Sequence, residues 1–192
     1  MKIYDAMCHI LARSDVLVFS DFNYGCLPQP LVEKLIEVAK VNNVLIAADS
    51  QSSSQVGDVS RFKAMDLITP TEHEARISMR NNVDGLVVLA EQLSNEASAK
   101  NVLLKMGEEG LLVHAGNSKS KDWLTDRVPA LNRSPKDVAG AGDSLLIASA
   151  MTLACRGSIW EAASIGSLAA AVQVGRLGNI PIQANELLKE LV

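Results

Sequence analysis

The alternation of short apolar runs with helix-forming segments is the feature that most constrains the fold of this chain. The runs that are expected to form strands lie at residues 16–19, 44–48, 65–68 and 102–104. Pro28 and Pro30 are expected to open a helix after the first run, because the first helical turn lacks N–H partners, and Asn42 marks its expected end. Continuous apolar strands separated by helices are typical of a mostly parallel sheet covered on both faces. The sequence therefore predicts an α/β fold with three layers, α/β/α.

The second half of the chain adds a hairpin and two helices. Residues 111–113 are expected to form a strand that pairs with 102–104 across the turn 107–110. The segments 143–155 and 159–174 are rich in alanine and apolar on nearly every face. Such helices are expected to be buried between layers rather than to lie at the surface.

Composition and charge exclude several classes of protein. The chain has 192 residues, 48% of them apolar, which fits a single globular domain over 1–192. A net charge of −4 gives no basic field for nucleic acid or an anionic membrane. Residues 1–15 lack the layout of a signal peptide, and no apolar run is long enough for a transmembrane helix. Because Cys8, Cys26 and Cys155 are far apart, we expect no disulfide framework and a cytoplasmic location.

The most informative motif is the segment 137–144, with the sequence DVAGAGDS. Gly140, Ala141 and Gly142 leave successive backbone N–H groups uncovered at the start of an apolar helix, which favours the binding of an anion. Asp143 would repel a bound phosphate unless it faces an incoming hydroxyl and takes its proton. From these residues alone a second interpretation stays open, in which the glycines only allow close helix packing and Asp143 caps the helix.

Other parts of the sequence add candidates on the substrate side and exclude two phosphate motifs. Asp21 and Asp49 follow strand candidates and are expected to face one cleft at the carboxyl edge of the sheet. The segment 50–60, rich in Ser and Gln, is either a surface loop or a loop on the substrate side. No P-loop motif occurs, and Leu145 stands where a dinucleotide fingerprint needs glycine, so an NAD-binding dehydrogenase domain is the weakest alternative.

The segment 137–144 resembles the C-terminal signature of the ribokinase-like (PfkB) carbohydrate kinase family. Four further segments resemble that family in the same order along the chain. They are 20–27, similar to S-D-Y-x-K-G-x-L of the heptose-phosphate kinase branch, 68–75, similar to N-P-N-E-x-E-A, 104–110, similar to the nucleotide turn V-T-L-G-x-x-G, and 167–178, similar to the late helix and its turn.

The resemblance implies a site for phosphoryl transfer from ATP to a sugar or sugar-phosphate hydroxyl. Asp143 would be the general base, and Gly140, Ala141 and Gly142 would form the anion hole. The residues that would bind the nucleotide are Lys105, Gly107 and Gly110 along the phosphates and ribose, Ser167 beside adenine, and Thr69 and Glu72 near the phosphates. Glu72 would act through water bound to Mg²⁺. The residues around a site where some members hold a monovalent cation, such as K⁺, are Asp137, Ala139, Gln173, Arg176 and Gly178.

The resemblance covers only the C-terminal, nucleotide-binding part of the family. Members begin with an N-terminal sugar-binding portion and a small β lid, and no segment of this sequence resembles them. Because the lid excludes water and orients the sugar, we expect the isolated chain to phosphorylate a sugar poorly or not at all. A missing N-terminal half or a second copy of the chain is the protein partner that this length suggests.

Three departures from the family pattern keep a second function open. Lys105 stands where the family has Thr, Ser167 where it has Asn, and Tyr24 where the heptose-phosphate branch has Lys. The alternative is a non-catalytic module, derived from such a kinase, that binds nucleotide or pairs with another chain.

Overall fold

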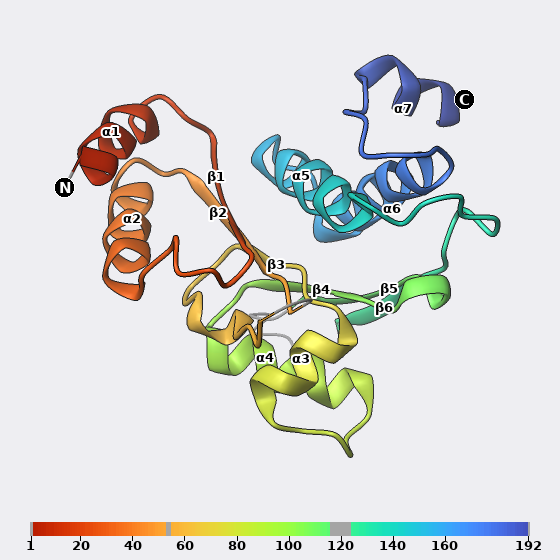
Figure 1. Cartoon of the computed structure of the whole chain (residues 1–192), viewed down its shortest axis with the longest axis horizontal. Coiled ribbons are helices and arrows are strands. Elements are labelled where there is room, and N and C mark those ends of the chain that lie inside the picture. Colours follow the sequence, from red (N-terminus) through yellow and green to blue (C-terminus); the bar gives the residue numbers. More distant parts are fainter. Residues whose placement is uncertain (1, 53–54, 116–123, 192) are drawn as a thin grey trace.

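The computed structural model of the chain describes residues 2–52, 55–115 and 124–191 (Figure 1). Within these residues six strands form one sheet in the order β1-β2-β3-β4-β5-β6. The strands are β1 Val16–Asp21, β2 Leu45–Ser50, β3 Leu67–Ile68, β4 Asn101–Lys105, β5 Leu111–Ala115 and β6 Thr125–Val128. β1 to β4 pair in parallel, and β4, β5 and β6 pair antiparallel. The mostly parallel sheet and the hairpin that the sequence predicts are both confirmed.

Helices cover both faces of the sheet, which gives the three layers. Parallel strands in sequence order need right-handed crossovers, and these place successive connecting helices on the same face. That face carries α2 Gln29–Val41, α3 Glu72–Met79 and α4 Leu86–Ala97, while α5 Ala141–Ala154 and α6 Ile159–Val174 cover the opposite face (Figure 1). The terminal helices α1 Lys2–Leu11 and α7 Ala184–Glu190 pack on α2 and α6.

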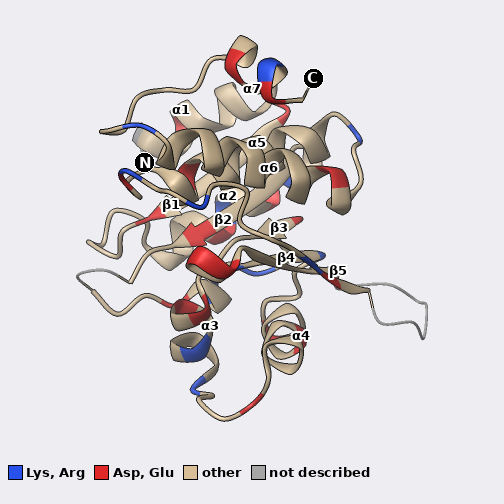
Figure 2. Ribbon diagram, turned by 90° about the vertical axis from the view of Figure 1, so that its right-hand side faces the viewer, with Lys and Arg blue, Asp and Glu red and all other residues tan. Residues whose placement is uncertain are grey.

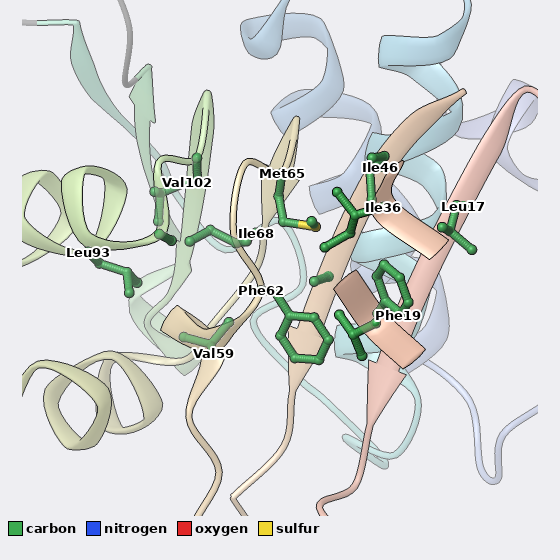
Figure 3. Close-up of a cluster of buried hydrophobic side chains, with 14 of the residues drawn as sticks. Leu17, Phe19, Ile36, Ile46, Val59, Phe62, Met65, Ile68, Leu93 and Val102 are labelled. Carbon is green, nitrogen blue, oxygen red and sulfur yellow. The ribbon is translucent and has the colours of Figure 1, made fainter. Parts of the chain in front are cut away.

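Each strand contributes side chains to two cores. Ile46 belongs to the core beneath α2 and α4, which Figure 3 shows, whereas its neighbour Ala47 belongs to the core beneath α5 and α6. In β4 the side chains of Val102 and Leu104 lie in the first core and that of Leu103 in the second. Because successive side chains point to opposite faces and both faces are buried, the strands have continuous apolar sequences.

The bounds of two elements differ from the sequence expectation. β3 is limited to Leu67–Ile68. The Ile46 N–H of β2 donates to the Asp66 side chain, at Oδ2, at 2.8 Å. In a longer β3 this N–H would donate to a main-chain carbonyl of that strand instead. The helix expected from residue 143 starts at Ala141 instead. The sequence analysis did not predict β6, α1 or α7. β6 and α7 are short, and in α1 polar side chains interrupt the apolar pattern.

The expectation that the alanine-rich helices are buried on nearly every face is wrong for α5. Its inner face, with Leu145, Leu146 and Ala150, is buried, but Ile147 is 45% exposed and Met151 is 59% exposed. α5 and α6 form an outer layer, so one side of each helix faces away from the sheet (Figure 1). In the part of the chain that the structure describes, no helix combines the length and the apolar character needed to cross a membrane.

The backbone at Gly110 should not tolerate a side chain. Gly110 has φ 93° and ψ −128°, a region that other residues rarely adopt. A Cβ there would lie 2.6 Å from Ala130 N and 2.7 Å from the carbonyl carbon of Pro129. Gly110→Ala is therefore expected to lower the free energy of unfolding by about 3 kcal/mol or more, measured by urea unfolding, because backbone strain and overpacking add.

Gly107→Ala is the matched control for this prediction. Gly107 also has a positive φ, of 61°, but a Cβ there would meet no atom within 4 Å. Gly107→Ala should lower the free energy of unfolding by about 1–2 kcal/mol, which is the cost of a left-handed conformation alone. Equal losses for the two variants would show that the contact with residues 129 and 130 does not constrain Gly110.

Candidate functional site

The parallel strands bring their carboxyl ends to one edge of the sheet, where open α/β sheets bind ligands. Asp49 lies near the end of β2, Lys105 ends β4, and Thr69 follows β3 at the same edge. The start of α5 reaches this edge too, because a Cβ on Gly142 would lie 3.3 Å from Lys105 Nζ. Figure 2 shows acidic segments where β2 ends and where α3 begins. The carboxyl ends of β2, β3 and β4, together with the start of α5, form the candidate site.

An ion pair between Lys105 and Asp49 lies at the centre of the site. Lys105 Nζ is 2.8 Å from Asp49 Oδ2, and the two side chains are 16% and 1% exposed. Burial raises the pKa of the Asp49 carboxyl above its ordinary value, the Lys105 ammonium opposes this rise, and the Glu74 carboxylate adds to it. The ammonium thus stands between a buried carboxylate and Gly142. From there it is within reach of an anion held at the start of α5.

The start of α5 offers main-chain N–H groups for such an anion. Those of Gly142 and Asp143 have no hydrogen-bond acceptor among the described residues. The Ala141 N–H, which the sequence assigns to the anion hole, instead donates to Val138 O at 3.3 Å. The Asp143 side chain is partly exposed and forms no hydrogen bond or ion pair with a described residue. Free amides at the positive end of a helix favour an anion, with the Asp143 carboxylate available to take a proton.

Gly140 connects this turn to the chain that follows α6. Its φ of 76° is left-handed, and a Cβ would lie 2.7 Å from Asn179 Cγ. The backbone conformation therefore favours glycine here, and a larger residue would in addition displace the Asn179 side chain.

The proposed nucleotide side of the site is a hollow of about 350 Å³ next to Lys105. Its lining residues are Thr71, Glu72, His73, Arg76, Lys105, Met106 and Gly107. Glu72 Oε1 accepts from Arg76 Nε at 2.8 Å, which leaves Oε2 without a partner among the described residues. A partly exposed carboxylate oxygen beside a phosphate site suits Mg²⁺, which keeps several of its waters, so Glu72 fits the role assigned to it.

Glu74 is a buried acid of this site that the sequence analysis missed. Its Oε2 accepts the Thr71 N–H at 2.7 Å, and its Oε1 accepts the Ser52 N–H at 3.1 Å. The first contact belongs to a capping box with the Thr71 side chain, and the T-x-x-E spacing of residues 71–74 is the signal for it. Glu74 thereby fixes the start of α3 and joins it to Ser52 in the segment 50–60. Residues 53 and 54 of that segment lie outside the described part.

Asp21 does not share the cleft of Asp49, which corrects the sequence expectation. Its Oδ2 is 2.7 Å from Arg61 Nη2, and its Oδ1 accepts the Asn23 N–H at 3.0 Å. In the register of β1 and β2, Asp49 pairs with Ser20, so the Asp21 side chain points to the opposite face. Both oxygens of Asp21 are therefore engaged in holding the loop after β1.

Two further residues that are predicted to bind the nucleotide, Ser167 and Gly110, form no interaction with other described residues that points to a nucleotide. Ser167 lies within α6 and is 8% exposed, and no hydrogen bond between described residues links it to the Lys105 side of the site. Its place beside adenine stays a prediction. Gly110 is explained by its contact with residues 129 and 130, so a role along the ribose also stays a prediction.

The residues assigned to a monovalent cation do come together, between the start of α5 and the end of α6. Asp137 Oδ1 accepts the Ala139 N–H, and Oδ2 accepts the Gly178 N–H, each at 3.0 Å. These N–H groups lower the pKa of the Asp137 carboxyl below its ordinary value. Arg176 and Gln173 join the same cluster by a contact of 3.1 Å between Nη2 and Oε1.

A larger hollow, of about 610 Å³, lies at the amino edge of the sheet, beside Leu45 and Asp66. Neither the glycine-rich turn before α5 nor the turn after β4 lines it. Because open α/β sheets bind ligands at the opposite edge, we place the candidate site at the Lys105 edge despite its smaller hollow.

Bare amides at a helix start are the means by which many open α/β sheets hold phosphate groups. The fold is a three-layer α/β fold, and the start of α5 is its candidate site for a phosphate group. The family model described as pfkB family carbohydrate kinase matches residues 4–185. The chain belongs to this family, as the sequence resemblance predicts.

Curated relatives named bifunctional protein HldE are similar to nearly the whole chain. The relative from Shewanella piezotolerans is 30% identical over 192 residues, which cover 98% of this chain and 38% of the relative. The relative from Geotalea uraniireducens is 27% identical and is matched over 99% of this chain and 38% of its own length. The chain thus spans well under half the length of these relatives.

Solved structures share the three-layer fold. Phosphofructokinase-2 from Escherichia coli, in complex with potassium, has a TM-score of 0.78 and 19% identity, and the match covers 98% of this chain and 59% of that one. Ribokinase from Arabidopsis thaliana, complexed with ribose and ATP, has a TM-score of 0.79 and 18% identity, with 97% and 59% covered. These matches confirm the ribokinase-like fold that the sequence resemblance predicts.

Thr69 is expected to destabilise the ligand-free chain. It is fully buried, and its Oγ1 has no hydrogen-bond partner among the described residues. Thr69→Val replaces this hydroxyl by a methyl group of similar shape. It should raise the free energy of unfolding by about 1 kcal/mol, because an unsatisfied buried polar group is removed. Chemical unfolding without nucleotide measures the change.

Thr71→Val is the matched control, two residues away. The Thr71 side chain accepts the Glu74 N–H at 3.2 Å at the start of α3. Its loss should therefore lower the free energy of unfolding by about 1 kcal/mol. A loss of stability in both variants would mean that the Thr69 hydroxyl has a partner, such as a bound water.

Proposed function

We propose that the chain carries the nucleotide site of an ATP-dependent kinase that phosphorylates a hydroxyl of a sugar or sugar phosphate. The observation that carries the proposal is the placement of Lys105 Nζ beside Gly142, where free amides and Asp143 share one helical turn. Membership of the pfkB family and similarity to HldE proteins support the sugar-kinase class. Similarity to the HldE proteins also supports an acceptor of the heptose-phosphate kind.

In the proposed reaction, the acceptor oxygen attacks the γ-phosphorus of ATP, and the bond to the β,γ-bridging oxygen breaks. Asp143 takes the hydroxyl proton, and ADP leaves with the bridging oxygen. The amides of Gly142 and Asp143, together with the Lys105 ammonium, hold the oxygens of the transferring group. Mg²⁺, when bound beside Glu72, supplies further positive charge to the phosphates. Catalysis then consists mainly of positioning and charge stabilisation.

We further propose that the isolated chain binds ATP but transfers phosphate slowly. The chain matches 59% of the length of the kinases of known structure. Sugar contacts and the exclusion of water would come from the portion that the match leaves out. Free thiols at Cys8, Cys26 and Cys155 support a reducing compartment such as the cytoplasm.

The second candidate function is a non-catalytic module that pairs with the remainder of a family-length kinase. Two observations favour it. In the sheet that the described residues form, β1 is an edge strand, with one side open for pairing. The match also covers only 59% of the solved phosphofructokinase-2 chain. A titration with Mg·ATP separates the two candidates, since micromolar binding supports the kinase site and no binding at millimolar ATP supports the module.

Lys105 should contribute to binding through the terminal phosphates. The double variant Lys105→Met with Asp49→Asn removes the ammonium without leaving a buried carboxylate unpaired. We expect its affinity for Mg·ATP to fall at least about tenfold, since a charge-assisted contact is lost, while its affinity for AMP changes less than about twofold. Isothermal titration calorimetry measures both affinities.

Asp49→Asn alone is the control for this experiment. In the unchanged chain Lys105 Nζ lies 2.8 Å from Asp49 Oδ2. The asparagine oxygen can still accept a hydrogen bond from Nζ, while the substitution removes the negative charge that competes with phosphate. Its ATP affinity should stay at or above that of the unchanged chain. An equal loss for ATP and AMP in the double variant would place Lys105 away from the terminal phosphates.

Asp143→Asn should separate chemistry from binding. Asparagine has a similar shape but cannot take a proton, so phosphoryl transfer should fall by about 10² or more. The affinity for Mg·ATP should stay within about twofold, because Asp143 forms no contact that holds the described fold. Transfer from labelled ATP to a panel of sugar phosphates, at high protein concentration, gives the rate. Equal losses in binding and transfer would show that Asp143 is structural.

A further inference from the structure

The two turns that flank the candidate site are joined through a buried glutamine side chain. Gln173, near the end of α6, is 1% exposed. Its Nε2 donates to the carbonyl oxygens of Ala139 and Gly178, at 3.0 Å each. These carbonyls come from the turn before α5 and the turn after α6, and they converge on one nitrogen atom.

The orientation of this amide is fixed by its other half. Gln173 Oε1 accepts from Arg176 Nε at 3.3 Å and from Arg176 Nη2 at 3.1 Å. Turning the amide over would place its oxygen against two carbonyl oxygens and its NH₂ group against a guanidinium, which are four unfavourable contacts. Arg176 is held in turn by Glu186 Oε1 at 3.1 Å and by Ile180 O at 2.7 Å.

These contacts do not fit the monovalent cation that the family resemblance suggests. Such a cation needs several oxygen atoms that converge on it and replace its water shell. Here a hydrogen-bond donor occupies the point where the Ala139 and Gly178 carbonyls converge. Asp137 is also engaged, because its two oxygens accept the N–H groups of the same two residues. The chain thus supplies positive hydrogen atoms of its own where an ion would supply charge.

We infer that the Gln173 side-chain amide, oriented by Arg176, takes the place of a monovalent cation, so that the fold and its nucleotide site do not depend on K⁺. The inference goes beyond the proposed function, and only its nucleotide readout rests on that function. It predicts that this chain differs in its ion response from a protein whose turns are joined by K⁺.

The first test compares the unchanged chain in 200 mM KCl and in 200 mM tetramethylammonium chloride, a cation too large for such a site. We expect the Tm to agree within about 1 °C and the ATP affinity within about twofold. A bound K⁺ at ten times its Kd would instead raise the Tm by about 3–6 °C. A K⁺-specific rise in Tm of that size would overturn the inference. Because the melting experiment contains no ATP, its failure is distinct from a failure to bind nucleotide, which would remove the proposed function.

The second test removes the amide. Gln173→Ala leaves the carbonyls of Ala139 and Gly178 facing an empty space, so the Tm should fall by several degrees. K⁺, but not tetramethylammonium, should restore at least about 2 °C of that loss, since the oxygens are now free for an ion. Gln92→Ala is the control, because among the described residues the Gln92 side chain hydrogen-bonds only to Asn81 and Asp84 at the surface. This variant should show no K⁺ response.

The outcomes of the second test each decide the inference. A folded Gln173→Ala chain without a K⁺ response would overturn the assignment of the amide to the place of the ion. If Gln173→Ala does not fold, Gln173→Glu replaces it, because the carboxylate adds an oxygen ligand and removes the donor. That variant should gain stability from K⁺, and its indifference to K⁺ would overturn the inference equally.

Discussion

Parallel pairing of β1 with β2 and of β2 with β3 fixes where the functional side chains of this chain lie. The register sets Ser20 beside Asp49, and so sends the Asp49 side chain toward α5 and the Asp21 side chain toward Arg61. A slip of one residue would exchange the two faces and leave a carboxylate among the buried side chains of the wrong core. The hydrogen bond from the Lys105 N–H to Pro70 O, at 2.8 Å, extends the same order to β4. The site thus follows from strand pairing before any side chain makes a contact.

The Lys105–Asp49 pair is costly to bury, and this cost indicates that the pair has a role in binding. Taking two charges out of water is offset only when their geometry is good and other polar groups assist. Here Asp49 Oδ1 also accepts the Ser50 N–H at 3.1 Å. Lys105 has no second acceptor among the described residues, although an ammonium carries three donors. A Cβ on Gly142, at the start of α5, would lie 3.3 Å from Lys105 Nζ. A cation with unused donors so near the free amides is the electrostatic reason to expect a polyanion there.

Much of the fold was predictable from the sequence, because it depends on apolar patterns. Continuous runs such as 44–48 indicate a strand buried on both faces, and the segment 159–174 coincides with α6. β3 was predicted too long because the effect of Asp66, whose side chain takes a main-chain N–H, depends on a partner far away in sequence. The short elements β6 and α7 have too few apolar residues to give a periodic signal.

The candidate site was predictable as a location but less so in its contacts. The DVAGAGDS segment indicates a helix start with bare amides, and the structure places it beside Lys105. The Ala141 amide is engaged because of the geometry of its turn, and Asp21 lies on the other face because of the register of β1 and β2. Neither the turn geometry nor the register can be predicted from the neighbouring residues alone. Glu74 has a local signal, the T-x-x-E spacing of a capping box, but that signal predicts a helix start and not a contact with Ser52.

The close contact between Gly140 and Asn179 has a consequence for how such chains diverge. A side chain at position 140 would compete with the Asn179 amide for one volume, so a larger residue at 140 requires that amide to turn away or to be replaced by a smaller group. Lineages that replace the glycine also need a turn that no longer has a left-handed residue at 140, and a smaller residue at 179 makes that change easier. The two positions should therefore covary among relatives, and the turn before α5 should be inherited together with the turn after α6 as one unit.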